Sequence, residues 1–203
     1  MKFFIFFLIL IFASSVGFCG ERIVFDFDEN TQWWEIPAWA VGNVDYAGVS
    51  LELSKDFVFS GENSLKFICD FPGDVWKAAI IEHERDIDLT GYKKITAHVY
   101  VPKDAKAQYL EARIVVTAGD WFFIETRDSV NLKKGEWTKV EAILDISKSG
   151  ELKEWRCSNR EECIRENLDE VKKISVRIEQ NANSWQPDNE YSGPIYIDDV
   201  VLE

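Results

Sequence analysis

The chain has 203 residues and a formal net charge of −13, because 36 acidic residues outnumber 23 basic ones. A surplus of this sign argues against nucleic acids and anionic membranes as partners and leaves neutral polymers open. The aromatic load is heavy, with 14 Phe, eight Trp and six Tyr. Eight indoles are difficult to hide in the core of one domain, so some of them are expected at the surface.

The first 20 residues have the three parts of a secretory signal peptide: a lysine, the apolar run Phe3–Phe12, and small residues after it. The apolar run is too short to cross a bilayer comfortably. We therefore predict a signal peptide over 1–20, a single domain over 21–203, and a secreted, periplasmic or cell-surface location. An uncleaved membrane anchor and lipid attachment at Cys19 are the alternatives, and the bulky Phe18 argues against lipid attachment.

Beyond the signal segment, apolar and polar residues alternate with a period of two, and turns with Gly or Pro interrupt the pattern. This pattern predicts strands over Ile23–Asp28, Val49–Leu53, Ser64–Phe71, Lys77–Glu84, Ile95–Val101, Trp137–Ile146, Ile174–Gln180 and Ile195–Leu202, with a hairpin over Tyr109–Arg127. Ile164, Leu168 and Val171 recur at helical spacing and predict one short helix, which Ser158 and Glu161 would cap. Many short strands predict an all-β fold, namely a two-sheet antiparallel β-sandwich of the jelly-roll type.

The hairpin has the clearest alternation in the chain, and a three-residue loop at 118–120 contains the glycine that such loops favour. The register of this loop predicts three facing pairs: Ile114 with Ile124 on the core side, and Arg113 with Glu125 and Thr117 with Trp121 on the outer side. Opposite charges that face each other across two strands stabilise the pairing. The outer side of the hairpin is therefore predicted to carry an indole, a hydroxyl and an ion pair.

The same alternation assigns outward-facing side chains on two further strands, 95–101 and 174–180. If these strands share a sheet with the hairpin, the outer face of that sheet carries His98, Tyr100, Arg113, Glu125, Arg177, Glu179 and Asn181. Such planar donors and acceptors can bind sugar hydroxyls. The alternative is a solvated face crossed by ion pairs.

Four tryptophans lie at loop tips or strand ends: Trp39, Trp76, Trp121 and Trp185. The apolar C–H face of a pyranose stacks on an indole, so these positions predict platforms for a polysaccharide. Packing at the rim of the sandwich is the alternative for each of them. The other four, Trp33, Trp34, Trp137 and Trp155, are predicted to pack in the core or at an edge.

Cysteines and acidic clusters give two further predictions. Cys157 and Cys163 are predicted to form a local disulfide in an exported protein, and Cys69 to be a buried free thiol. Acidic residues cluster at 26–29 near the first strand and at 198–199 in the last strand. Together with carbonyls of the turn at 60–64 they would form a structural calcium site. The alternative is that these carboxylates only cap strand ends.

Several stretches resemble non-catalytic carbohydrate-binding modules with the galactose-binding-like jelly-roll fold: Phe25–Asp28, Ser60–Phe67, Asp88–Ile95, Val99–Pro102 and Gly193–Val200. The resemblance covers nearly all of 21–203 and is closest to family 27, the mannan-binding modules attached to β-mannanases. It implies a mannan chain bound in a cleft, with Trp39, Trp76 and Trp121 at the positions of the platforms. It also implies a structural calcium ion at Asp28, Asn63 and Asp198.

The predicted function is therefore a secreted, monomeric, non-enzymatic module that binds a β-linked polysaccharide, with mannan or glucomannan first, on a concave sheet face. One alternative is a structural or adhesive envelope protein that uses the same fold for protein contacts. Another is a jelly-roll glycan lyase or hydrolase. For an enzyme, Glu82 and Glu84 could share a face, whereas His83 between them points to the other side.

Overall fold

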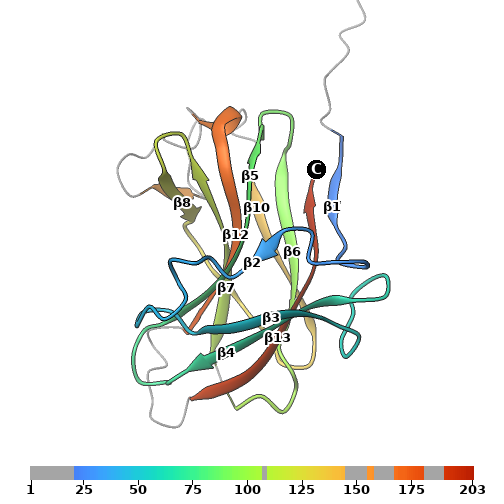
Figure 1. Ribbon diagram of the computed structural model, residues 1–203, viewed down its shortest axis with the longest axis vertical. Helices are drawn as coiled ribbons and strands as arrows, with labels where there is room; N and C mark the ends of the chain where they lie inside the picture. The colour runs from blue at the N-terminus through green and yellow to red at the C-terminus, as the bar shows by residue number, and fades with distance from the viewer. Residues whose placement is uncertain (1–20, 107–108, 145–154, 158–166, 181–189) are drawn as a thin grey trace, which may run out of the picture.

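The computed structural model describes residues 21–106, 109–144, 155–157, 167–180 and 190–203. Two antiparallel sheets stack face to face, and β1 lies beside the end of β13 near the C-terminus (Figure 1). The predicted all-β, two-sheet antiparallel β-sandwich is therefore confirmed. Among the described residues the only helical element is the 3₁₀ turn η1, Leu168–Glu170.

The first sheet, called sheet A below, has the strand order β10-β6-β13-β4-β3, and β1 also pairs with β13. Its strands are β1 (Ile23–Phe25), β3 (Gly48–Ser54), β4 (Ser64–Phe71), β6 (Lys94–Tyr100), β10 (Trp137–Ile143) and β13 (Tyr191–Leu202). Every pairing in this sheet is antiparallel. Strands far apart in the sequence thus become neighbours, and the last strand lies in the middle of the sheet.

The second sheet, sheet B, has the order β11-β8-β7-β12-β5-β2, and β9 also pairs with β7. Its strands are β2 (Trp34–Glu35), β5 (Ala78–Ile87), β7 (Leu110–Ala118), β8 (Phe122–Thr126), β9 (Val130–Asn131), β11 (Trp155–Cys157) and β12 (Val171–Gln180). Strand β12 pairs with β7 on one side and β5 on the other. It is therefore the centre of this sheet.

The core lies between the sheets and is formed by alternate residues of each strand. In β6 the buried row is Ile95, Ala97 and Val99, and in β12 it is Ile174, Val176 and Ile178. Both rows were predicted to point inward, and both predictions are confirmed. Cys69 is a free, fully buried thiol, also as predicted.

Three sequence-based predictions about the fold are wrong in detail. Val171 was assigned to the helix but begins β12, because the pairing with β5 and β7 continues to it through a bulge. The hairpin register is shifted, since Thr117 pairs with Phe123 and the loop is 119–121. Strands β6 and β12 do not share a sheet. The predicted signal peptide and Cys163 lie outside the described residues, so the signal peptide and the Cys157–Cys163 disulfide stay predictions.

Candidate functional site

Charged side chains from three neighbouring strands gather on the outer face of sheet B. On β12, Arg177 has Arg113 of β7 as its Cα partner, and Ser175 has Glu82 of β5. Alternation puts Lys173, Ser175, Arg177 and Glu179 in one outward row. These side chains are buried rather than exposed, as are Arg113, Glu125 and Glu82. The prediction of an exposed polar face is thus wrong, because the charged groups pack against one another.

Two arginines and two glutamates form the centre of this face. Arg113 Nη2 lies 2.5 Å from Glu179 Oε1, and Arg113 Nη1 lies 3.7 Å from Glu125 Oε1. Arg177 pairs with Glu125 and, at 3.5 Å, with Glu179 Oε2. The predicted Arg113–Glu125 pair therefore exists, although the Cα partner of Glu125 is Val115. Breaking one such buried pair would leave an uncompensated charge, so the four side chains hold one another in place.

A second charged group lies further along β12. Lys173 Nζ is 2.7 Å from Glu82 Oε1 and 2.8 Å from Glu84 Oε2. Burial raises the pKa of Glu82, and the hydrogen bond and charge of Lys173 offset that rise only in part. Burial acts to lower the pKa of Lys173, but the two glutamates outweigh it and the net shift is upward. Lys173 is therefore held as a cation.

Three of the four predicted tryptophan platforms border this face, and each contacts a buried charged residue of it. Trp76 Nε1 donates to Glu179 Oε2 at 3.1 Å. The Trp39 indole lies beside Glu82 and acts to lower the pKa of that carboxyl. The ring of Trp121 lies 5.8 Å from Lys173 Nζ, within cation–π range. Their side chains remain 38%, 45% and 62% exposed for Trp76, Trp39 and Trp121, so the indoles are fixed yet accessible.

The spacing of these platforms follows from β12. Trp76 contacts Glu179 and Trp121 approaches Lys173, which lie six residues apart on the same row of that strand. At about 3.3 Å per residue, this corresponds to about 20 Å along the sheet. Trp76, Arg113 and Trp121 therefore border one face, and that face is long enough for an extended ligand.

The turn between β7 and β8 explains why Trp121 stands out from the sheet. Gly119 has φ +51° and Trp121 has φ +61°. A left-handed conformation costs a bulky residue about 1–2 kcal/mol, so the surrounding contacts must hold it. The N–H of Gly119 donates to the carbonyl of Glu170 at 3.0 Å. Strain of this kind at an exposed aromatic residue is typical of a functional position.

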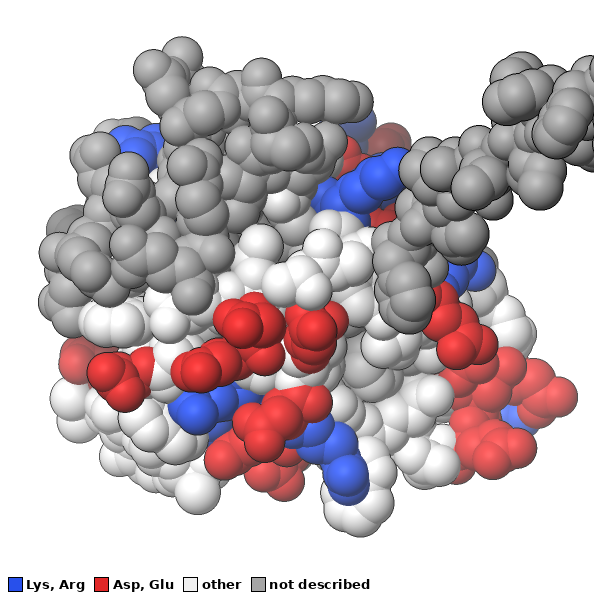
Figure 2. All heavy atoms as spheres, turned by 90° about the horizontal axis from the view of Figure 1, so that it is seen from above, with Lys and Arg blue, Asp and Glu red and all other residues white. Residues whose placement is uncertain are grey.

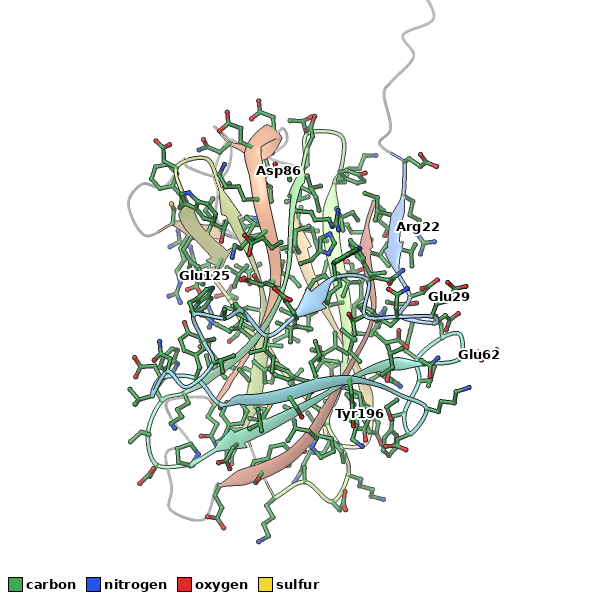
Figure 3. The ribbon with its side chains drawn as sticks, viewed as in Figure 1. Arg22, Glu29, Glu62, Asp86, Glu125 and Tyr196 are labelled. Atoms are coloured by element: carbon green, nitrogen blue, oxygen red, sulfur yellow. The ribbon has the colours of Figure 1, made fainter. Side chains whose placement is uncertain are left out.

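The remaining predicted ligand residues lie elsewhere. His98 and Tyr100 belong to β6 in sheet A, where Phe59 stacks on His98 at 3.7 Å and Phe57 stacks on Tyr100 at 4.4 Å. Grouping them with Arg113 is wrong, because β6 pairs with β10 and β13. In Figure 3 the two sheets can be located by the labelled residues: Glu125 belongs to sheet B and Tyr196 to sheet A. Asn181 and Trp185 lie outside the described residues.

Sequence reasoning missed several residues of this face. Lys173 was missed because the strand was predicted to begin at Ile174, whereas it begins at Val171. Tyr46 packs edge-on against Trp39 at 4.9 Å, and the Phe123 ring lies 5.7 Å from Arg177 Cζ. Continuing the alternation of 174–180 back to 173 would have identified Lys173. The sequence carries no comparable signal for Tyr46.

For the other four tryptophans, packing in the core or at an edge is confirmed at three and wrong at Trp33. Trp34 and Trp155 are buried, and Trp137 packs near Phe59 and Tyr100. Trp33 was predicted to pack, but it is 70% exposed, and Arg85 Cζ lies 4.3 Å from its ring centroid. A positive φ of 67° turns it away from the core side that Trp34 occupies.

The predicted calcium ligands meet at the loop between β3 and β4. Asn63 Nδ2 donates to the carbonyl of Asp28 at 2.7 Å, and Asp198 Oδ2 accepts the N–H of Phe59 at 2.8 Å. A Cβ on Gly61 would lie 2.2 Å from Asp28 Oδ1, so this close approach requires glycine. Burial raises the pKa of Asp198 to about 6. Within the described ranges no group of three or more His, Cys, Asp or Glu could hold a metal, so these residues fit the donor set only in part.

The predicted enzyme cluster does not assemble into an acid–base pair. Glu82 and Glu84 do share a face, but both pair with Lys173. His83 points to the other side, 4.7 Å from Phe25 between ring centroids, and its Nδ1 lies 3.1 Å from the carbonyl of Gln32. These contacts make His83 a packed, hydrogen-bonded residue of the core side.

The acidic surplus appears on the molecular surface. Figure 2 shows acidic side chains gathered over the end of the sandwich that it presents, with few basic ones between them. On sheet B, by contrast, the buried cations and anions pair with one another. The described part of the chain contains no helix with the length and hydropathy that a membrane crossing needs.

No family model matches the sequence, and no curated protein matches it significantly. Solved structures do match the fold. The first is a structure reported for the promiscuous specificity of carbohydrate-binding modules from the β-sandwich superfamily, with TM-score 0.58 and 15% identity. The match covers 88% of this chain and 61% of that structure's chain, so this chain spans less than two thirds of that chain's length.

Other matches with a TM-score above 0.5 include a cellulose-binding module and an agarase. A family 28 module specific for non-crystalline cellulose has TM-score 0.54 and 13% identity, with 88% of this chain covering 92% of that one. An exo-β-agarase has TM-score 0.53 and 12% identity, with 90% of this chain covering 25% of that one. The chain therefore has a carbohydrate-binding-module-like fold, and identities of 15% or less do not resolve a specific family.

Proposed function

We propose that this protein is a non-catalytic carbohydrate-binding module that binds a neutral, β-linked polysaccharide on the outer face of sheet B. One observation carries the proposal: Trp39, Trp76 and Trp121 border a single face, and each is fixed by a buried charged residue while remaining accessible. Indoles bind the apolar face of a pyranose, and neighbouring polar groups bind its hydroxyls. The fold that this chain shares with carbohydrate-binding modules supports the proposal.

Charge balance favours an uncharged glycan. The cations Arg113, Arg177 and Lys173 are each paired with glutamates on the same face. Because every one of these cations has a glutamate partner, the face offers no surplus cation for a uronate or sulfate. Mannan and glucomannan are the first candidates among neutral β-linked chains. The roughly 20 Å of β12 between Lys173 and Glu179, which Trp121 and Trp76 approach, favours an oligosaccharide over a monosaccharide.

Affinity electrophoresis and calorimetry with glucomannan, galactomannan, soluble cellulose derivatives and xylan test the proposal. We expect at least one of these to bind. Trp76→Ala and Trp121→Ala should each weaken binding about 30-fold, or about 2 kcal/mol, the size of effect that a central aromatic anchor has. Phe59→Ala, which removes an exposed aromatic ring from the loop between β3 and β4, is the control and should bind as wild type. Absence of binding to every glycan would overturn the proposal.

The alternatives give different results with the same protein. A lyase or hydrolase would release soluble products from mannan or alginate, and we expect none. A structural or adhesive protein would bind a protein partner through an interface that does not depend on the three tryptophans. Loss of glycan binding in Trp76→Ala together with unchanged glycan size would separate the module from both alternatives.

We further propose a structural calcium ion at Asp28, Asn63 and Asp198, export from the cytoplasm, and a monomeric state. The contacts among these three residues and the loop between β3 and β4 support the first part. The signal-like segment at residues 1–20 supports the second. Mass spectrometry of the protein purified from culture medium would test export by its N-terminal residue, and sedimentation would test the oligomeric state.

A further inference from the structure

A groove of about 690 Å³ opens beside strands β4 and β13 of sheet A, the sheet opposite the one that carries the proposed platforms. It lies where β13 begins beside the end of β4, and the segment 102–106 forms one wall. Aromatic, proline and acidic side chains line it, including Phe57, Tyr196, Pro102, Asp70, Asp104 and Glu190. This volume is within the range of ligand-binding pockets, about 300–1,000 Å³.

One end of the groove is aromatic and held in place by its neighbours. Phe57 is 38% exposed, and its ring stacks on Tyr100 at 4.4 Å and packs on Tyr196 at 5.0 Å. Tyr196 donates its hydroxyl to Asp56 at 3.2 Å. Since Tyr100 covers one side of the Phe57 ring and the ring also lines the groove, the aromatic surface is formed before any ligand arrives.

The wall is also preformed. The N–H of Ala105 donates to the carbonyl of Pro102 at 3.1 Å, and Lys134 Nζ donates to the carbonyl of Ala105 at 3.1 Å. Gly135 donates its N–H to the carbonyl of Val101 at 2.8 Å. These bonds tie the wall to the segment that follows β9, so Asp104 is carried on a fixed turn.

The other end of the groove is anionic. Asp70, Asp104 and Glu190 are exposed, and the structure gives none of them a salt bridge within the described ranges. Among the lining residues that the structure describes, Lys106 is the one basic side chain. This differs from sheet B, where each buried cation is paired with a glutamate. Unpaired carboxylates beside an aromatic surface suit a ligand with an apolar ring face and a positive charge.

We propose that this groove is a second glycan-binding site, which takes a saccharide with a free amino group. The sugar ring would pack on the exposed part of Phe57, and the ammonium group would lie toward Asp70 and Asp104. The site is separate from the proposed platforms on sheet B, so it binds whether or not they are occupied.

Calorimetry with a glucosamine oligomer and an N-acetylglucosamine oligomer tests this site at about pH 5.5, where ordinary carboxylates are still ionised. We expect the amine-bearing oligomer to bind and the acetylated one to bind at least tenfold more weakly. Asp70→Asn/Asp104→Asn should weaken binding of the amine at least tenfold, and so should Phe57→Leu, which keeps an apolar side chain but removes the flat ring. Asp86→Asn, at the far end of the sandwich (Figure 3), is the charge-matched control and should have no effect.

Three results would overturn the proposal: no binding of the glucosamine oligomer, equal affinity for the acetylated oligomer, or a loss of binding in Trp76→Ala in place of the groove variants. Oligolysine is a further arm. If oligolysine binds through Asp70 and Asp104 with no effect of Phe57→Leu, the groove is a cation site for basic peptides and the saccharide assignment is wrong. Neutral-glycan binding at the tryptophans is measured separately, so failure here leaves the proposed function testable.

Discussion

Glu179 shows how a single buried residue can position a surface platform. One of its carboxylate oxygens contacts Arg113 at 2.5 Å, and the other accepts the indole N–H of Trp76 at 3.1 Å. The carboxylate therefore connects the buried ion pairs of sheet B to an exposed ring. Glu82 likewise lies beside both Lys173 and the indole of Trp39. The charges on this face thus fix the tryptophans as well as one another.

Glu179→Gln tests this positioning role. Glutamine keeps the shape but has one acceptor oxygen, so either Trp76 or Arg113 loses its partner. We expect the free energy of unfolding to fall by about 3 kcal/mol, the lower end for a broken buried pair, because Arg113 keeps Glu125. The indole N–H resonance of Trp76, assigned through Trp76→Phe, should shift.

The control for Glu179→Gln is Glu84→Gln, which removes a half-exposed partner of Lys173 and should cost less than about 1 kcal/mol. Equal stability losses in the two variants would contradict the positioning role, and so would an unchanged Trp76 resonance in Glu179→Gln. A change in glycan affinity without either effect would place Glu179 in direct contact with the ligand.

The lowered pKa of His83 should make the stability of the fold depend on pH. Burial lowers its pKa, the hydrogen bond to the Gln32 carbonyl opposes this, and the charge of Arg85 adds to it. The unfolded chain therefore takes up the proton more readily than the folded one. The free energy of unfolding should fall as the pH drops below about 6.5, until the folded pKa is passed.

Comparison with His83→Phe isolates this residue, since phenylalanine can pack on Phe25 and Trp34 but cannot titrate. Urea unfolding of both proteins across this pH range should show a steeper loss in wild type. Asp198 acts in the opposite direction, because burial raises its pKa to about 6, but it is present in both proteins and cancels in the difference. Parallel curves would show that His83 makes no contribution.

At the scale of the element, the β7–β8 hairpin shows what alternation can and cannot predict. The two strands, their core faces and the Arg113–Glu125 pair follow from the period of two. The register does not, because Trp121 counts as a strand residue in the pattern but adopts a left-handed turn conformation. Backbone conformation at a single turn residue leaves no periodic signal, and here it shifts every pairing.

Gly119→Ala tests whether this turn positions Trp121. Alanine at this position would have to adopt the left-handed φ of +51°, and its Cβ would lie 2.3 Å from Asn167 Oδ1. We expect a loss of stability of about 1–2 kcal/mol together with weaker glycan binding. Gly135 has a φ of +78° but follows β9, which pairs with the end of β7 opposite the Trp121 turn, so Gly135→Ala should lose stability and keep its affinity. Equal affinities in the two variants would separate the turn from binding.

Across the whole molecule, the sequence predicted the strands better than their partners. Buried rows such as Ile95–Val99 repeat locally, so they can be found from sequence. Which sheet a strand joins depends on pairings between distant segments, such as β6 with β13, and local patterning carries no information about them. This is why His98 and Tyr100 were grouped with Arg113. The same limit applies to burial, since an outward-pointing Arg177 is covered only once its neighbours are in place.

The loop between β3 and β4 contacts both the segment that follows the first strand and the last strand. Asp28 follows the first strand and contacts this loop through Asn63, while Asp198 in the last strand accepts the N–H groups of Phe59 and Ser60. Asp198 is fully buried.

A calcium ion here would offset the cost of burying that carboxylate and would bind only the folded chain, so it should stabilise the fold by about 2.7 kcal/mol at a free concentration of 100 times its Kd. Removal with EDTA should lower the melting temperature by about 5–10 °C, since 1 kcal/mol corresponds to about 2–4 °C in a chain of this size.

Calcium should restore the melting temperature and magnesium should not, because magnesium demands a stricter geometry. Asp28→Asn should abolish the calcium response and Asp86→Asn should retain it. A melting temperature that EDTA leaves unchanged would reduce these carboxylates to acceptors for backbone N–H groups.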